Sequence, residues 1–71
     1  MGTAINPAKL LQSKWTAVTP QNREKHFLVT ALTRNGEAIT GCTLEAVHSR
    51  REFEIDWREL KNAERWRQGW V

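Results

Sequence analysis

The dipeptide Asn35-Gly36 is the sequence feature that most constrains how this chain can fold. It separates two runs rich in β-forming residues, 26–34 and 38–47. A type I′ turn needs positive φ at both of its central positions, and Asn and Gly tolerate that conformation best. The sequence therefore predicts a β-hairpin whose two-residue turn is Asn35-Gly36.

A second hairpin follows from the strict alternation of acidic and apolar residues over 52–57, which is typical of a strand with one buried face. Its turn is centred on Ser49-Arg50 or formed by a four-residue loop over 48–51, and both give the same register. The two hairpins then place the same apolar side chains on one face of a three-stranded meander, an agreement that a one-residue slip would destroy. That face consists of Phe27, Val29, Cys42, Leu44, Ala46, Phe53, Ile55 and Trp57.

The opposite face of the predicted meander is mixed. Its apolar members include Leu28, Leu32 and Ile39, a patch that the N-terminal turn or the C-terminal tail could cover. The register also places Glu45 opposite both His26 and Glu54. The predicted cross-strand pairs include Phe27–Leu44, Val29–Cys42, Cys42–Trp57, Leu44–Ile55 and Ala46–Phe53.

The two ends of the chain are predicted to be short helices and turns. Residues 1–5 read as a flexible start, and Asn6-Pro7 favours a short helix over 7–12, since Asn caps a helix and Pro suits its first position. Residues 14–18 read as a strand and 19–23 as a turn-forming loop.

After Trp57 the alternation stops. Asn62 is expected to cap a short helix over residues 63–68, and Gly69 to end it. Trp66 and Trp70 are four residues apart, so they would share one face if this helical turn persists.

The chain must fold without the stabilisation that a disulfide or a bound metal ion provides. It has 71 residues and one cysteine, so neither an internal disulfide nor a cysteine zinc site is available. Ordering it costs roughly 1.5 kcal/mol per residue, and each of its four tryptophans can bury about 150–250 Å². Most tryptophans are therefore expected in the core. We expect residues 1–71 to form one small, mostly β domain, an antiparallel β-barrel or roll of four to five strands with short terminal helices.

Charge and hydropathy limit the partners and the compartment. The formal net charge of +3 and the pI near 9.6 permit anionic partners without requiring them. There is no long apolar run for a membrane span and no signal-peptide pattern, and a lone free cysteine fits a reducing compartment. We therefore expect a cytoplasmic protein with no membrane contact.

Four short blocks rich in aromatic and charged residues are Lys14-Trp15-Thr16-Ala17, Glu24-Lys25-His26-Phe27, Glu52-Phe53-Glu54-Ile55-Asp56-Trp57 with Leu60, and Trp66-Arg67-Gln68-Gly69-Trp70. Together they resemble the small tryptophan-rich conserved hypothetical proteins of bacteria. The resemblance spans Asn6 to Trp70 and implies a bacterial protein in a family of unknown function. It carries over no catalytic or binding residue.

The sequence contains no catalytic constellation. His26 and His48 have no partner at metal-ligand spacing. The predicted register buries Cys42, where a free cysteine acts as a small hydrophobic residue. The acidic residues at alternate positions over 52–56 fit the solvent-exposed face of a strand at the edge of a sheet. We therefore expect a protein that is not an enzyme, with no catalytic residue, no cofactor and no metal site.

Basic residues interleaved with tryptophan give the strongest functional signal. They occur at the tip of the second hairpin and after the last predicted strand, in a pattern that resembles a base-stacking surface beside phosphate-binding side chains. The same arginines could instead only neutralise the acids of residues 52–56. The candidate nucleic-acid-binding residues are Arg50, Arg51, Arg58, Lys61, Arg65, Arg67, Trp66 and Trp70.

Two functions of different classes fit these features. The first is a non-catalytic binding module for RNA or a ribonucleoprotein. The alternative is a protein–protein interaction or self-association domain that uses a sheet edge or the patch of Leu28, Leu32 and Ile39. Either agrees with a monomer or a weak dimer.

Overall fold

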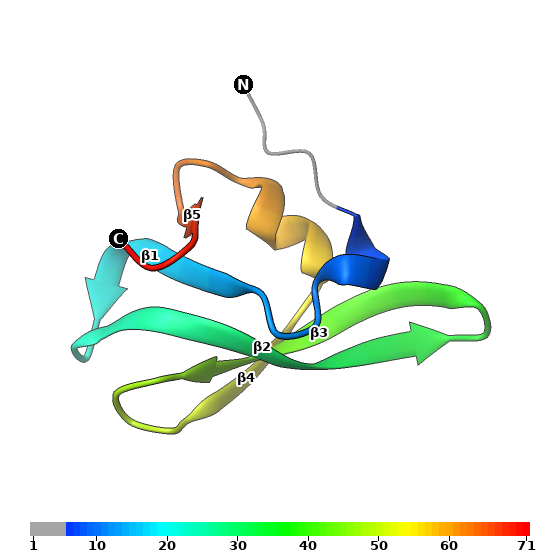
Figure 1. Ribbon diagram of the computed structural model, residues 1–71, viewed down its shortest axis with the longest axis horizontal. Coiled ribbons are helices and arrows are strands. Elements are labelled where there is room, and N and C mark those ends of the chain that lie inside the picture. The colour runs from blue at the N-terminus through cyan, green and yellow to red at the C-terminus, as the bar shows by residue number, and fades with distance from the viewer. Residues whose placement is uncertain (1–5) are drawn as a thin grey trace.

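Residues 6–71, the part of the chain that the computed structural model describes, form one antiparallel five-stranded sheet with strand order β4-β3-β2-β1-β5 (Figure 1). Two short 3₁₀ helices, η1 and η2, lie on one side of the sheet. The predicted flexible start, residues 1–5, lies outside the described residues. The elements in chain order are η1 (Pro7–Lys9), β1 (Lys14–Gln21), β2 (Glu24–Asn35), β3 (Ala38–Ala46), β4 (Glu52–Ile55), η2 (Trp57–Lys61) and β5 (Trp66–Gln68).

The mostly β fold class is confirmed, but the sheet is not closed into a barrel. β4 and β5 are its two edge strands and do not pair with each other. The segment over 56–65, which contains η2, connects these two edge strands across one face of the sheet (Figure 1). The result is a flat molecule with extents of 35 × 29 × 15 Å.

The turn between β2 and β3 lies one residue further along than predicted. Asn35 pairs with Ala38, so the central turn residues are Gly36 and Glu37, and only Gly36 has positive φ, at +64°. Positive φ at the first central position alone is the pattern of a type II′ turn, which favours Gly there. The Asn-Gly signal therefore located the hairpin but not its turn type.

The predicted register is wrong by two residues, and the predicted core face is nevertheless confirmed. Leu44 pairs with Val29 on one side and with Phe53 on the other, in place of Phe27 and Ile55. Because side chains alternate with a period of two residues, a two-residue shift keeps every side chain on its face. All eight predicted residues lie in the core cluster or pack against it.

The second hairpin differs from the prediction in its loop. Five residues, 47–51, connect β3 to β4, and Arg50 has φ +64°. Glu45 therefore faces Glu52 and Leu28 in place of Glu54 and His26. The two like charges are offset by Arg50, whose guanidinium lies 3.5 Å from the Glu45 carboxylate.

The predicted apolar patch on the opposite face does not form. A β-bulge lies between Val29 and Ala31, where Thr30 is an extra residue in β2 with no partner in β3. An extra residue reverses the alternation beyond it, and Leu32 consequently packs against the core cluster. Leu28 and Ile39 are half-buried. The prediction that Leu28, Leu32 and Ile39 form one exposed patch for self-association is therefore wrong.

The core lies on the face of the sheet that η1 and η2 cover. Trp15 and Leu60 are fully buried in it, and Trp57 and Trp66 pack against it. Trp70, which is 42% exposed, is the tryptophan most open to water. The prediction that most tryptophans are structural is confirmed. The buried core residues are Leu10, Trp15, Phe27, Val29, Cys42, Leu44, Ala46 and Leu60.

The N-terminal segment follows the prediction more closely than the first loop does. Asn6 caps η1 by accepting a hydrogen bond from the amide of Ala8 at 3.1 Å, although the helix ends at Lys9. The loop predicted over 19–23 is instead mostly strand, because β1 continues to Gln21. The turn is reduced to Asn22 and Arg23, whose φ angles of 54° and 64° are those of a type I′ turn.

The predicted C-terminal helix over residues 63–68 is wrong. The Asn62 side chain accepts a hydrogen bond from the amide of Glu64 at 3.0 Å, which closes a single turn. The chain then pairs with the centre of β1, where Ala17 faces Trp66. Ladder hydrogen bonds and the burial of Trp66 against the core outweigh the weak helical tendency of so short a segment.

Besides the two edge strands, part of β2 also has no partner strand on one side. The hairpin of β2 and β3 extends beyond its neighbours (Figure 1), and β1 pairs with β2 only as far as Leu28. Within the described residues, the outer edge of β2 from Ala31 to Arg34 has no strand beside it. Interaction with another protein or a second copy through a sheet edge stays a prediction.

Candidate nucleic-acid interface

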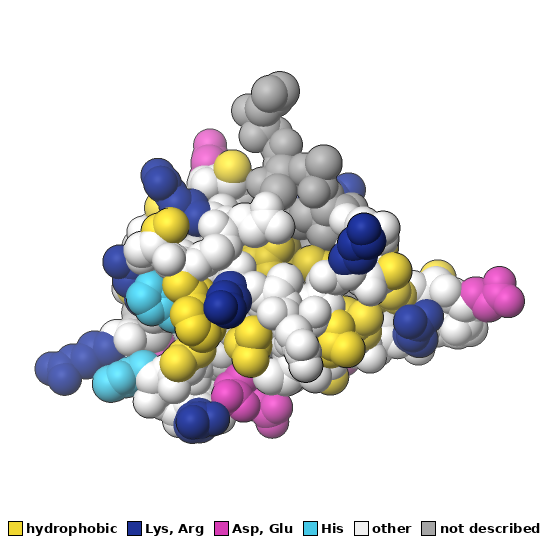
Figure 2. Space-filling view, viewed as in Figure 1, with side chains coloured by type: hydrophobic (Ala, Val, Ile, Leu, Met, Phe, Trp, Pro, Cys, Tyr) yellow, Lys and Arg dark blue, Asp and Glu magenta, His cyan; other side chains and the backbone are white. Residues whose placement is uncertain are grey.

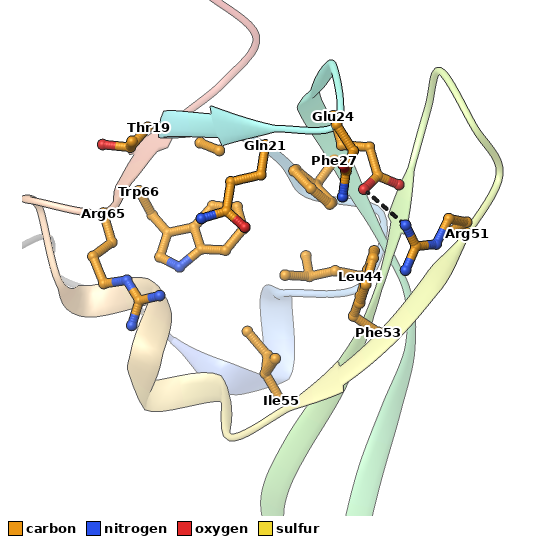
Figure 3. Close-up of a pocket in the computed structure, with 12 residues that line it drawn as sticks. Thr19, Gln21, Glu24, Phe27, Leu44, Arg51, Phe53, Ile55, Arg65 and Trp66 are labelled. Carbon is orange, nitrogen blue, oxygen red and sulfur yellow. Dashed lines mark hydrogen bonds and ion pairs between the residues drawn. The ribbon is translucent and has the colours of Figure 1, made fainter.

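An open cavity of about 460 Å³ lies where β1 bends away from β2 (Figure 3). Thr16 pairs with His26 and Gln21 with Glu24, so β1 has four residues where β2 has one. Pro20 lies in this bulge, where its missing N–H group costs no ladder hydrogen bond. A bulged strand bends, and here the bend opens the space between β1 and the core.

Aromatic and aliphatic side chains form the inner wall of this cavity. The ring centroids of Phe27 and Trp66 lie 5.2 Å apart in an edge-to-face arrangement, and those of Phe27 and Phe53 lie 6.1 Å apart. Leu44 and Ile55 complete the apolar wall (Figure 3). The rim is polar, formed by side chains of β1, the first turn, the start of β2, the loop before β4 and the segment before β5: Thr19, Gln21, Asn22, Glu24, Arg51 and Arg65.

Arg51 is held in place by neighbouring side chains. Its Nη1 lies 3.4 Å from Oε1 of Glu24, and its guanidinium lies 5.0 Å from the centroid of the Phe53 ring. The Glu24 side chain is only 6% exposed, and it also accepts a hydrogen bond from the hydroxyl of Ser49. A buried carboxylate needs such partners, so Arg51 is needed to tie β4 and its loop to β2.

Arg65 is differently placed. Its backbone carbonyl accepts a hydrogen bond from the amide of Val18 at 2.9 Å, which fixes the chain just before β5. Its exposed side chain lies along the cavity rim beside Trp66 (Figure 3). No ion pair involves Arg65 within the part of the chain that is described, so its guanidinium is available to an anionic ligand.

The structure does not bring the eight sequence-predicted binding residues to one surface. Arg51, Arg65 and Trp66 meet at the cavity. Arg58 pairs with Asp56 at 3.1 Å, while Lys61 lies 5.0 Å from the ring centroid of Trp57. Arg50 lies at the tip of the second hairpin in its pair with Glu45.

Arg67 and Trp70 lie near β1 on the face opposite the core. Gly69, with φ +84°, redirects the chain after β5. The indole N–H of Trp70 donates to the carbonyl of Phe27 at 3.0 Å, and its ring lies 4.8 Å from Nζ of Lys14 and 5.9 Å from the His26 ring. Trp66 and Trp70 therefore do not share a face.

The three ion pairs among residues 6–71 all involve arginines predicted to bind nucleic acid: Arg50, Arg51 and Arg58. The pairing with Arg58 also changes the acidity of Asp56. Hydrogen bonds from the backbone amide and the side chain of Arg58 lower the pKa of the Asp56 carboxyl group. Only Asp56 is one of the acids of residues 52–56, so the alternative interpretation of the sequence holds for Arg58, whereas Arg50 and Arg51 pair with Glu45 and Glu24.

Several cations without an ion pair in the described chain lie around β1, the first turn and β5. On the face shown in Figure 2, Lys and Arg side chains are separated by hydrophobic and uncharged ones rather than gathered in one patch. Sequence reasoning missed Lys25, because only the pairing of β5 with β1 brings it near Arg67. In the described residues, the lysines and arginines of this region without an ion pair are Lys14, Arg23, Lys25, Arg65 and Arg67.

His26, His48 and Cys42 are not among the residues that line the cavity. Nε2 of His26 lies 3.1 Å from the carbonyl of Val71, and His48 is exposed in the second loop. Within residues 6–71 there is no group of three or more His, Cys, Asp or Glu side chains arranged to hold a metal ion. Cys42 is fully buried, and this burial together with the charges of Asp56 and Glu59 raises the pKa of its thiol to about 11.

The raised thiol pKa predicts a loss of stability in alkaline solution. The folded protein keeps the Cys42 proton until about pH 11, whereas the unfolded chain loses it near the ordinary value of 9.0. The free energy of unfolding should therefore fall as pH rises from about 9 to 11, by up to about 1.4 kcal/mol per pH unit. Urea titrations of wild type and Cys42→Ala across this range would test this, since the difference between them should shrink as pH rises. A constant difference would contradict it.

The fold defines a class, the small proteins built on a single open antiparallel sheet with a tryptophan-rich core. A family model described as "Tryptophan-rich protein (DUF2389)" matches residues 13–71. The chain therefore belongs to this tryptophan-rich family of unknown function, as its sequence blocks suggested. No curated protein matches the chain, and no solved structure matches it. Neither helix of residues 6–71 has the length and apolar character needed to cross a membrane.

Proposed function

We propose that this protein is a non-catalytic module that binds single-stranded RNA and takes one unpaired base into the cavity beside Trp66. The observation that carries the proposal is the combination at this cavity of an aromatic wall and an arginine without an ion pair in the described chain. Proteins recognise RNA mainly through unstacked bases, which stack on aromatic side chains while basic groups hold the phosphates. We assign this function to the bacterial cytoplasm, because a reducing compartment suits the free Cys42 thiol.

The dimensions and chemistry of the cavity support a small planar ligand. Its volume of about 460 Å³ falls within the range of small-molecule sites, about 300–1,000 Å³. Phe27 and Phe53 are fixed by packing in the core, so the wall is preformed and loses little entropy on binding. The polar side chains of Gln21 and Asn22 reach the rim from the bent end of β1 and its turn, where they can hydrogen-bond a base edge.

The charges around the cavity support a modest affinity. Arg51 is largely neutralised by Glu24, which leaves Arg65 as the main attraction for a phosphate group. One exposed arginine beside a stacking site gives weak binding with a modest salt dependence, a logarithmic slope of about 0.7 for one neutralised phosphate. The formal net charge of +3 agrees with such a role.

The test is a titration of a labelled short single-stranded RNA, followed by fluorescence anisotropy at several salt concentrations. Wild type should bind at low salt, with the logarithm of affinity falling against the logarithm of salt by about 0.7 per phosphate neutralised. Arg65→Gln should weaken binding roughly tenfold, because it removes a charge-assisted hydrogen bond to the RNA. Trp66→Leu should weaken it similarly by removing the stacking surface, with folding verified by circular dichroism.

The control for this titration is Arg58→Gln, which removes the same charge from an arginine that is paired with Asp56 and does not line the cavity. It should bind nearly as well as wild type. The proposal would be contradicted if wild type bound no RNA at low salt, or if its affinity did not change with salt concentration.

A further inference from the structure

A second cavity of about 250 Å³ lies near the C-terminal end of the chain, beside β1 and β5. It differs from the first in having no aromatic wall. Its lining consists of small or aliphatic groups with two cations: Thr16, Ala17, Val18, Lys25, Arg67 and Val71.

Lys25 and Arg67 are the polar groups that this second cavity offers to a ligand. Both are exposed, and neither forms an ion pair with any acid in the described part of the chain. The hydroxyl of Thr16 is already engaged, since it donates to the carbonyl of Gly69 at 2.7 Å and accepts from the amide of Val71 at 3.1 Å. No side-chain carboxylate lines the cavity among the described residues, so the side-chain charges around it favour an anion.

The two cavities are joined by the edge of the sheet. Ala17 borders both of them, and it pairs with Trp66, while its neighbour Thr16 pairs with Arg67. Because successive side chains of a strand point to opposite faces, Trp66 faces the first cavity and Arg67 the second. β5 is an edge strand, so a ligand can pass around it from one cavity to the other.

We propose that Lys25 and Arg67 form a phosphate subsite for the same RNA strand whose base occupies the first cavity. The strand passes around the edge of β5, with the base against Trp66 and an adjacent phosphate between the two cations. This inference rests on the proposed function and adds to it a direction for the bound strand. It also gives a role to Arg67, which lies between Trp66 and Trp70 in the sequence.

The experiment compares the full chain with two double variants that each remove two positive charges. Lys25→Gln/Arg67→Gln removes the subsite, and Arg58→Gln/Lys61→Gln removes the same charge from η2, remote from it. All four side chains are exposed, and matched melting temperatures would verify that both variants fold. Binding of a short single-stranded RNA is then measured against salt, as for Arg65→Gln.

The subsite variant should bind roughly tenfold more weakly than wild type at low salt. Its salt slope should fall by about 0.7 for each phosphate that is no longer neutralised, while the η2 variant stays close to wild type. If wild type binds RNA but both double variants show the same reduction in affinity, the effect is one of net charge and the subsite is refuted. If wild type binds no RNA, the proposed function fails, and the subsite fails with it.

An RNA with one abasic nucleotide at each position in turn separates the two cavities. Where the missing base is the one held by Trp66, binding should no longer depend on Trp66. The dependence on Lys25 and Arg67 should persist, since a phosphate remains at every abasic position. If one abasic position removed the dependence on Trp66 and the dependence on Lys25 and Arg67 together, the two cavities would not be separate subsites.

Discussion

Trp15→Ala is expected to unfold the protein or to remove most of its stability. Trp15 is fully buried at the centre of the core, in a strand that pairs with both β2 and β5. Its indole N–H also donates to the hydroxyl of Ser13 at 2.8 Å. Replacing a buried aromatic residue by alanine costs about 3–5 kcal/mol. A domain of this length has only about 4–11 kcal/mol in total, at about 0.05–0.15 kcal/mol per residue.

Urea denaturation followed by far-UV circular dichroism would measure the effect of Trp15→Ala. Leu11→Ala is the matched control, because Leu11 is 50% exposed beside the buried Leu10 and should change stability by no more than about 0.5 kcal/mol. A Trp15→Ala protein with the wild-type urea midpoint would contradict the central position given to this ring.

Gly41→Ala is expected to displace β4 from the sheet. A Cβ atom at Gly41 would lie 2.7 Å from the backbone carbonyl oxygen of Ile55, and this oxygen cannot move unless β4 moves with it. Gly-to-Ala changes usually stabilise an unstrained site by about 0.4–1 kcal/mol through the unfolded chain. Here the clash should reverse that sign and cost about 1–3 kcal/mol, as overpacking does.

Amide hydrogen exchange would localise this effect. Gly41→Ala should increase exchange along β4, in particular at Phe53 and Ile55, which face Leu44 and Cys42. Gly36→Ala is the control, since a Cβ there meets nothing within 4 Å. It should cost only about 1–2 kcal/mol for its positive φ and leave β4 protected. Equal protection of β4 in wild type and Gly41→Ala would show that the close approach of Gly41 to the Ile55 carbonyl does not exclude a side chain at position 41.

The central meander could be predicted from the sequence because its signals are local. Alternation from Glu52 to Trp57 and the turn near Gly36 fix which side chains share a face, and this result survives a register error of two residues. The bulge at Thr30 could not be predicted in this way. It depends on how β2 and β3 twist against their neighbours, and it moved Leu32 into the core and removed the predicted patch.

The candidate site was predicted in part. Arg65, Arg67 and Trp66 were identified by type, since basic residues beside tryptophan have a clear chemical meaning for nucleic acids. The sequence left open whether the arginines would bind nucleic acid or neutralise acids. It did not indicate that Arg50 and Arg51 would pair with Glu45 and Glu24, because these pairs depend on how strands and loops meet in the folded chain. Nor did it indicate Lys25, which approaches Arg67 only because the last strand pairs with the first.

The sequence by itself determined the β class, the inward face of the meander and the structural use of most tryptophans, because these follow from alternation and from the area that a small chain must bury. Tertiary structure alone decided that the sheet stays open, that residues 66–68 form a strand and that two cavities meet at its edge. The physical reason is that β5 is too short to have a conformation of its own. Its structure comes from β1, and the pairing of chain segments so far apart in sequence leaves no local pattern to read.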